Sequence, residues 1–238
     1  MVENLETFCV RQTYVNGQLV AENGVTRIER VPVVPLNRFG AIPRAVEDFH
    51  VPATSPRIRV IEALNGQLVT NELHRTVPVV NDGLSCDLAQ DVLKIAVLNR
   101  YTPAPPAVAF VHGFGLKHGA IASSVAHDSH NIVAVGTSDE SLCQAVNALV
   151  ECRGGLAVVN ETGTHVLPLE VAGLMSADGL AVADGYARLT RLARELGATL
   201  TAPFMTLSFM ALLVIPSLKL SDRGLFDGRN FQFTSLTL

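Results

Sequence analysis

The amino-acid sequence predicts a mixed α/β (α+β) fold in which layered helices pack on a mixed sheet, preceded by a small β-hairpin. Two kinds of segment carry this prediction. Short apolar runs bounded by glycine or polar residues are typical of buried strands, and they occur at 107–111, 132–135, 156–159 and 166–169. Longer amphipathic segments begin at a capping residue and end at glycine, as helices do.

The first 56 residues contain a predicted hairpin and a linker. Residues 13–20 form strand, turn and strand around Asn16-Gly17, because Asn-Gly accepts the positive φ angles of a type I′ turn. The same turn chemistry recurs at Asn65-Gly66. Residues 31–56 contain five prolines and little periodicity, which predicts an extended segment over the surface and a domain boundary. The predicted organisation is a hairpin at 1–30, a linker at 31–56 and a larger domain at 57–238.

A helix is predicted from Asp87 to Arg100. Its apolar positions follow the i, i+4, i+7, i+8 spacing of one helix face, and they are Leu88, Val92, Ile95 and Ala96. Asp87 would cap its start, and Arg100 would lie near its end, where the helix dipole favours a cation. Asp91 and Lys94, three apart, would then form either a solvated surface pair or an interdomain contact.

The segments after residue 131 predict a crossover unit and a second helix. The order is strand 132–135, a helix over about 140–152 and strand 156–159, which favours two strands paired in parallel. The second helix is expected from Asp178 to Leu196, because glycine follows it in the C-cap position.

The C-terminal part of the sequence predicts a buried apolar element and a hairpin. The apolar segment 202–215 is interrupted and shorter than the roughly 20 residues that span a bilayer, so we expect it inside the domain. A polar turn at 221–224 is followed by an alternating strand at 231–233.

The segment 111–131 holds the densest group of chemically active side chains, including four of the seven histidines. A polar cluster at the mouth of a strand is where a ligand or partner surface is commonly met. The candidate active-site-edge or interface residues are Lys117, Ser123, His127, Asp128, Ser129, His130 and Asn131. We expect them at a cleft edge, because each buried polar group left unpaired costs about 1 to 3 kcal/mol. The simpler interpretation is that they shape tight turns.

The residue types in this segment are those of three kinds of site. His127 and His130, with Asp128, are weak metal-ligand candidates, since the chain has neither a His-x-His pair nor the HExxH pattern. Ser123 and Ser124 beside the same histidine and aspartate supply the residue types of a nucleophilic triad, but no Gly-x-Ser-x-Gly elbow is present. The glycines at 113 and 115 complete no phosphate-binding motif. We therefore expect no cofactor in this chain alone.

Composition excludes several classes of partner. A net charge of −4 without any Lys/Arg run leaves no electrostatic footprint for nucleic acid or an anionic membrane. With 48% hydrophobic and 17% charged residues, part of the surface is expected to be an interface, as in a homo-oligomer. The four cysteines show no Cys-x-x-Cys spacing, and residues 1–8 lack the features of a secretory signal, which predicts free thiols in the cytoplasm.

Several segments resemble the C-terminal region of bacterial adenine deaminases, which belong to the amidohydrolase superfamily. They follow the family's order and lie at 91–97, 113–117, 119–123, 125–132, 154–156, 172–176, 203–209, 214–216 and 218–225. Two positions depart from the family pattern. Arg100-Tyr101 stands where that pattern has Arg-His, and His112 stands where it has Lys.

The resemblance implies that residues 1–30 are a remnant of the β-sandwich flanking an amidohydrolase barrel. For the intact enzyme it implies hydrolysis of adenine to hypoxanthine and ammonia in purine salvage, with water activated by Mn²⁺ or Fe²⁺ in the barrel. The expected partner is an adenine deaminase barrel domain or chain, and the chain alone is expected to be inactive. The alternatives are a non-catalytic binding or assembly module that pairs with a separate metal-dependent barrel chain, and an inactive truncated product.

Overall fold

The computed structural model describes residues 1–29 and 31–238, and it divides into two compact units, Met1–Val34 and Pro35–Leu238. The N-terminal unit holds an antiparallel sheet of β1 (Gln12–Val15), β2 (Gln18–Glu22) and β3 (Val25–Thr26). Its predicted hairpin is confirmed, because β1 and β2 meet at Asn16-Gly17, where φ is 49° and 78°. Residue 30, the predicted end of this hairpin, lies outside the described residues, and the predicted domain boundaries stay predictions.

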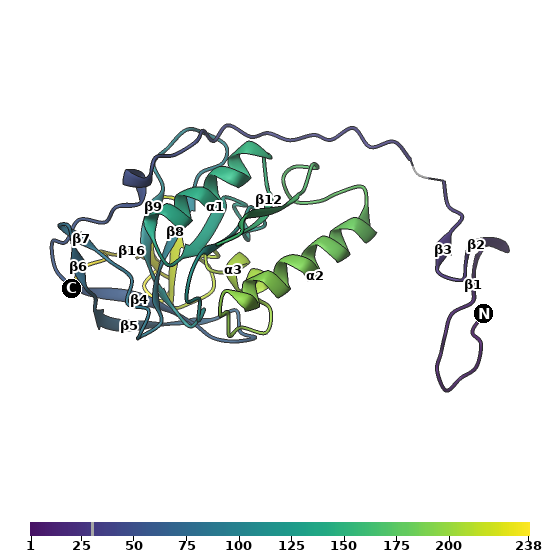
Figure 1. Ribbon diagram of the computed structural model, residues 1–238, viewed down its shortest axis with the longest axis horizontal. Coiled ribbons are helices and arrows are strands. Elements are labelled where there is room, and N and C mark those ends of the chain that lie inside the picture. The colour runs from purple at the N-terminus through teal and green to yellow at the C-terminus, as the bar shows by residue number, and fades with distance from the viewer. Residues whose placement is uncertain (30) are drawn as a thin grey trace. The chain divides into compact units, whose positions relative to one another are not determined.

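The larger unit is built on an eight-stranded mixed sheet with the order β13-β12-β10-β11-β8-β9-β4-β5 (Figure 1). Its strands are β4 (Arg57–Ala63), β5 (Thr70–Thr76), β8 (Val92–Leu98), β9 (Ala107–His112), β10 (Ala120–Ser123), β11 (Ile132–Gly136), β12 (Gly155–Asn160) and β13 (Gly163–Pro168). Only β4 and β9 pair in parallel among these described strands. The predicted mixed fold is thereby confirmed.

Helices and two small sheets complete the larger unit. The helices are η1 (Val46–Phe49, a 3₁₀ turn), α1 (Asp139–Glu151), α2 (Gly179–Glu195) and α3 (Pro203–Ser208). The small sheets pair β6 (Val79–Val80) with β7 (Gly83–Leu84), and β14 (Leu218–Ser221) with β15 (Gly224–Asp227) and β16 (Gln232–Phe233). The predicted turn at 221–224 joins β14 to β15.

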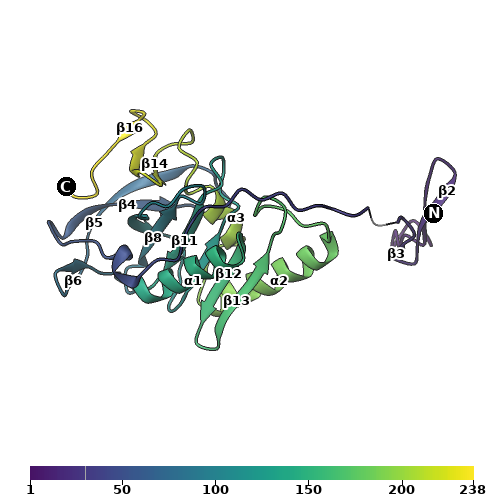
Figure 2. The ribbon, with the colours of Figure 1, turned by 90° about the horizontal axis from the view of Figure 1, so that it is seen from above.

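Both faces of the sheet are covered (Figure 2). The first face packs against α1 and the buried side chain of Phe49. The second packs against α2, α3 and the β14–β15 hairpin, which meet side chains from β8, β10, β11 and β12. Each Leu or Val buried in these two layers contributes roughly 1.5 to 3 kcal/mol through removal of apolar surface from water. The sheet is therefore the centre of a three-layer core.

Segment 92–98 is a strand, so the helix predicted from Asp87 to Arg100 is wrong. All seven residues of β8 are buried, with Leu93, Ile95 and Val97 facing one layer and alternate residues facing the other. A strand covered on both faces loses its apolar–polar alternation, and a continuous apolar run then matches the helical spacing by chance. Asp87 is a cap, but of a turn, because its carboxylate accepts the backbone N–H groups of residues 89 and 90.

The strands before and after α1 do not pair with each other, which corrects the predicted crossover unit. β10 lies between them and is antiparallel to both β11 and β12. The two outer strands therefore run in the same direction, as predicted, but one strand apart. The prediction missed β10 because its four residues, Ala-Ile-Ala-Ser, are too short and small to give a strand signal.

The ends of both long helices follow the predicted capping chemistry. Ser138 precedes α1, and its hydroxyl accepts the backbone N–H of Ser141 at 3.2 Å. Asp178 precedes α2, and its carboxylate accepts the N–H of Ala181 at 3.1 Å. Gly197 follows α2 with φ +104°, a conformation that favours glycine.

The predicted solvated surface pair of Asp91 and Lys94 is also wrong, whereas their interdomain role stays a prediction. Asp91 lies before β8 and accepts the backbone N–H groups of Gly113 and Gly115 at 3.0 and 2.8 Å, which holds the glycine-rich segment in place. Lys94 is buried on the α1 side of the sheet, where its ammonium lies 2.5 Å from the carboxylate of Asp139 and 3.3 Å from the carbonyl of Phe49. An ion pair thus ties the central strand to the first residue of α1.

Removing one partner of this ion pair should destabilise the domain. We expect Asp139→Ala to lower the free energy of unfolding by about 3 to 5 kcal/mol, because it leaves the Lys94 charge buried and unpaired. Glu140→Ala, at the next and exposed position of α1, is the matched control and should cost about 1 kcal/mol or less. Urea unfolding of both variants measures the difference. Equal losses would show that the Lys94–Asp139 contact contributes nothing specific.

Candidate functional site

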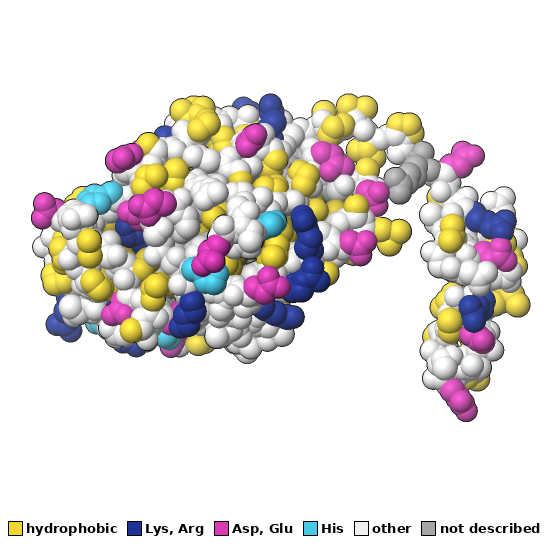
Figure 3. Space-filling model, in the orientation of Figure 1, with side chains coloured by type: hydrophobic (Ala, Val, Ile, Leu, Met, Phe, Trp, Pro, Cys, Tyr) yellow, Lys and Arg dark blue, Asp and Glu magenta, His cyan; other side chains and the backbone are white. Residues whose placement is uncertain are grey.

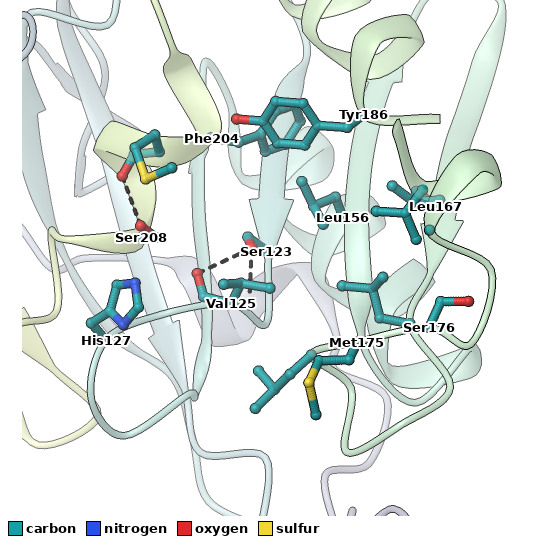
Figure 4. A pocket seen from close by; sticks show the side chains of 15 residues that line it. Ser123, Val125, His127, Leu156, Leu167, Met175, Ser176, Tyr186, Phe204 and Ser208 are labelled. Carbon is teal, nitrogen blue, oxygen red and sulfur yellow. Dashed lines mark hydrogen bonds between the residues drawn. The ribbon is translucent and has the colours of Figure 1, made fainter. Parts of the chain in front are cut away.

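A partly open cavity of about 390 Å³ lies between the sheet and the N-terminal half of α2 (Figure 4). Its size falls in the range of ligand and partner pockets in proteins. Most of the lining is apolar, and the principal wall residues are Val125, Leu156, Leu167, Leu169, Val182, Tyr186 and Phe204. Ser123, Ser208 and His127 supply the polar groups on the side formed by β10 and α3.

The cavity exists because α2 packs firmly by only its C-terminal half. Its inward stripe follows helical spacing through Val182, Tyr186, Leu189 and Ala193. The last two residues are fully buried against the sheet, whereas the first two are only partly buried and line the cavity. Burial raises the pKa of the Tyr186 phenol, so this ring stays neutral at physiological pH.

The candidate polar residues lie on the loop that joins β10 to β11. Ser123 ends β10, and its hydroxyl accepts the N–H of Val125 at 3.0 Å and donates to the carbonyl of the same residue at 3.2 Å. Ser124 is fully buried, donates to the carbonyl of Gly173 at 2.6 Å and accepts the N–H of Gly155 at 2.8 Å. These serines fix the start of the loop by hydrogen bonds, and neither touches a histidine as a triad nucleophile would.

His127 occupies the cavity edge. Its backbone N–H donates to the carbonyl of Ser208 at 2.8 Å, and its ring stacks on Phe209 with 4.8 Å between centroids. The ring of His130 meets it edge-on at 5.6 Å. Asp128, between them, is exposed. The loop is thus anchored to the end of α3, and one imidazole faces the cavity.

His130 is partly buried and stays neutral. Its Nδ1 atom is buried and has no hydrogen-bond partner among the described residues. Burial lowers the pKa of the imidazole, the neighbouring His127 and Arg100 lower it further, and the carboxylate of Asp128 opposes them. Protonation of this ring is therefore disfavoured.

Arg100 and Tyr101 hold the far end of the loop. The buried guanidinium of Arg100 donates to the carbonyl of Ala172 and to the hydroxyl of Tyr101, and that hydroxyl donates to the carbonyl of Ser129 at 2.9 Å. Asn131 is buried and accepts the N–H of Arg100 at 3.3 Å. Tyr101 thus braces the loop through its hydroxyl.

Lys117 lies away from the other candidates. It is exposed, and its backbone N–H donates to the carbonyl of Leu196 beside the C-terminal end of α2. Two residues separate it from the start of β10, whereas the histidine loop begins at the opposite end of that strand. The structure therefore brings Ser123 and His127 to one cavity and leaves Lys117 outside it.

Sequence reasoning missed Phe209 and Lys219 as supports of the site. Lys219 is fully buried in β14, and its ammonium donates to the carbonyls of Leu68 and Phe209 at 2.8 and 3.0 Å. It contacts no carboxylate among the described residues, and burial lowers its pKa to about 8. A single lysine between two leucines is typical of a strand with one exposed face, so the sequence does not indicate that this lysine is buried and supports the site.

The predicted metal ligands do not form a metal site. Across residues 1–29 and 31–238, no group of three or more His, Cys, Asp or Glu side chains is arranged to hold a metal ion. His127 and His130 meet each other edge-on, and the ring of the first is stacked on Phe209. These residues therefore do not fit a divalent-metal centre by themselves.

The fold and the cavity define a mixed α/β domain whose site is built from the β10–β11 loop, α2 and α3. This chain belongs to the adenine deaminase C-terminal domain family, whose model matches residues 67–232. The resemblance inferred from the sequence segments is thereby confirmed.

Whole adenine deaminases match almost all of the chain. The enzyme of Salinibacter ruber is 56% identical over 236 residues, which are 98% of this chain and 43% of that protein. The enzyme of Sulfurovum sp. is 52% identical over 235 residues, with the same two shares. That of Methanosarcina acetivorans is 45% identical over 246 residues, 99% of this chain and 44% of the relative. The chain spans about two-fifths of the length of these curated relatives and corresponds to their C-terminal part.

The buried ammonium of Lys219 should give the domain a distinct pH dependence. Between pH 8 and 10.5 the unfolded state holds a proton on this lysine that the folded state has lost, so stability rises with pH. The difference in unfolding free energy between the unmodified chain and Lys219→Met should shift by about 2 kcal/mol in favour of the unmodified chain from pH 7 to pH 10. Lys117→Met, at an exposed position, is the control, and its difference from the unmodified chain should be the same at both pH values. Urea unfolding at the two pH values tests this, and a constant difference for Lys219→Met would contradict it.

Proposed function

We propose that this chain functions as the C-terminal part of an adenine deaminase whose metal-dependent chemistry is carried out by a separate barrel domain or chain. The main support is the 56% identity to the Salinibacter ruber enzyme across 98% of the chain. More than half of that enzyme lies outside the match, and this length is sufficient for a separate catalytic domain.

The N-terminal unit supports the same proposal. None of its described residues is buried, although it has a three-stranded sheet. Figure 3 shows hydrophobic side chains on its surface. Its exposed large apolar residues include Met1, Leu5, Phe8, Val10, Tyr14, Val15, Val25 and Ile28. A sheet that buries no apolar face of its own is completed by another surface, and we propose that residues 1–30 complete the β-sandwich beside the barrel.

The reaction in this proposal is hydrolysis of adenine to hypoxanthine and ammonia in purine salvage. A divalent ion, Mn²⁺ or Fe²⁺, would supply an activated water in the barrel. The ligands of this ion are proposed to come from the barrel, since no group of three or more ligands is found among the described residues of this chain. Among the described residues no helix is long and apolar enough to cross a membrane, and the four cysteines are free thiols, which is compatible with a cytoplasmic enzyme.

A chimera provides the test. We would replace the matching 236 residues of the Salinibacter ruber enzyme by this chain and assay adenine loss and ammonia release with Mn²⁺ or Fe²⁺. The chimera should deaminate adenine, whereas the 238-residue chain alone should not, because the activated water is supplied from outside it. The Salinibacter enzyme lacking the matched region is the control.

Two outcomes would contradict the proposal. Metal-dependent turnover by the chain alone, with contamination excluded, would place the chemistry within these residues. A folded but inactive chimera would favour the alternative of a non-catalytic assembly module that pairs with a different barrel chain.

A further inference from the structure

The cavity beside α2 is surrounded by exposed apolar side chains. Met175, just before α2, is 57% exposed, and Met205 in α3 is 53% exposed; both line the cavity. Leu180 follows the cavity-lining Gly179 and is 74% exposed. Apolar surface therefore continues from the cavity walls onto the exterior, which is the pattern of a surface that another macromolecule covers. Methionine suits this role because its flexible side chain adapts to the shape of a partner.

The serine hydroxyl groups of the cavity already have partners inside the domain. Ser208 donates to the carbonyl of Met205 at 2.7 Å, Ser176 donates to Glu170 at 2.8 Å, and Ser123 is bonded to Val125. A polar heterocycle in this cavity would meet few side chains free to pair with it, and each of its polar groups left unpaired would cost roughly 1 to 3 kcal/mol. The walls therefore fit apolar side chains better than a purine.

The rim of the cavity offers one polar anchor. No hydrogen bond to the ring nitrogens of His127 is present among the described residues, and the neighbouring Asp128 is exposed. An apolar centre with a polar rim is the usual anatomy of a protein–protein interface.

We propose that this cavity and its rim form a docking surface for the part of the adenine deaminase polypeptide that lies outside the match, which inserts apolar side chains beside α2. The inference rests on the proposed function. The choice of occupant rests on chain length, because more than half of each of these two relatives lies outside the matched region and is available to cover this surface. The apolar rim of the cavity is built from α2, α3 and the segment just before α2.

Thiol labelling measures whether this surface is covered. We would introduce Met175→Cys and Met205→Cys, with Val79→Cys as the matched control, because Val79 is 50% exposed in β6 and lines no part of this cavity. Each variant is made in the 238-residue chain and in the Salinibacter chimera. The rate of modification by N-ethylmaleimide at each position is read by peptide mass spectrometry, which separates it from the native cysteines.

The expected result is fast labelling at all three positions in the chain alone, and labelling at positions 175 and 205 at least about tenfold slower in the chimera. Position 79 should react equally in both. Equal rates at 175 and 205 in the two proteins would overturn the inference. So would protection in the chain alone that grows with its concentration, which identifies a second copy, or protection that requires added adenine, which identifies a small ligand.

The labelling result is separable from deaminase activity. An inactive chimera with protected positions 175 and 205 contradicts the proposed function and leaves the docking surface standing. An active chimera with unprotected positions does the reverse.

Discussion

The constraint on which the structure depends is that its central sheet is covered on both faces. The strands β8, β10 and β11 are buried along their whole length, so a polar side chain in this layer must find a partner within the protein. Lys94 does so through Asp139, and Ser124 does so through two backbone groups. The apolar stripe of α1 packs on one face of the sheet, and the apolar stripe of α2 packs on the opposite face.

This constraint also locates the site. Because the central strands accept few polar side chains, the polar residues gather where a strand ends. β10 is only four residues long, and the loop between it and β11 carries His127, Asp128 and His130 at the ends of these two strands. The loop is held from two sides, by Phe209 at the end of α3 and by the Arg100–Tyr101 brace. An apolar cavity next to this loop results, because only the C-terminal half of α2 packs closely on the sheet.

The elements that sequence reasoning predicted correctly have local signals. Serine and aspartate caps mark the starts of α1 and α2, Gly197 marks an end, and glycine bounds several strands. The failures occur where tertiary burial removes the local signal. β8 is apolar on both faces and therefore imitates a helical spacing, and β10 has no distinctive residue at all. The polar loop was found because its residues crowd together, whereas Phe209 joins it only through folding, from 82 positions away along the chain. No local pattern encodes such a contact.

The central claim is that the β10–β11 loop serves the rest of the enzyme and does not merely shape this domain. The most direct measurement compares His127→Ala with His118→Ala, an exposed histidine before β10, in the Salinibacter chimera. For His127→Ala the account predicts a fall of about tenfold or more in kcat/KM for adenine, with the melting temperature within about 3 °C of the parent. His118→Ala should change neither. A lowered melting temperature for His127→Ala with full activity in the surviving folded protein would contradict the claim, because the histidine would then serve the fold alone.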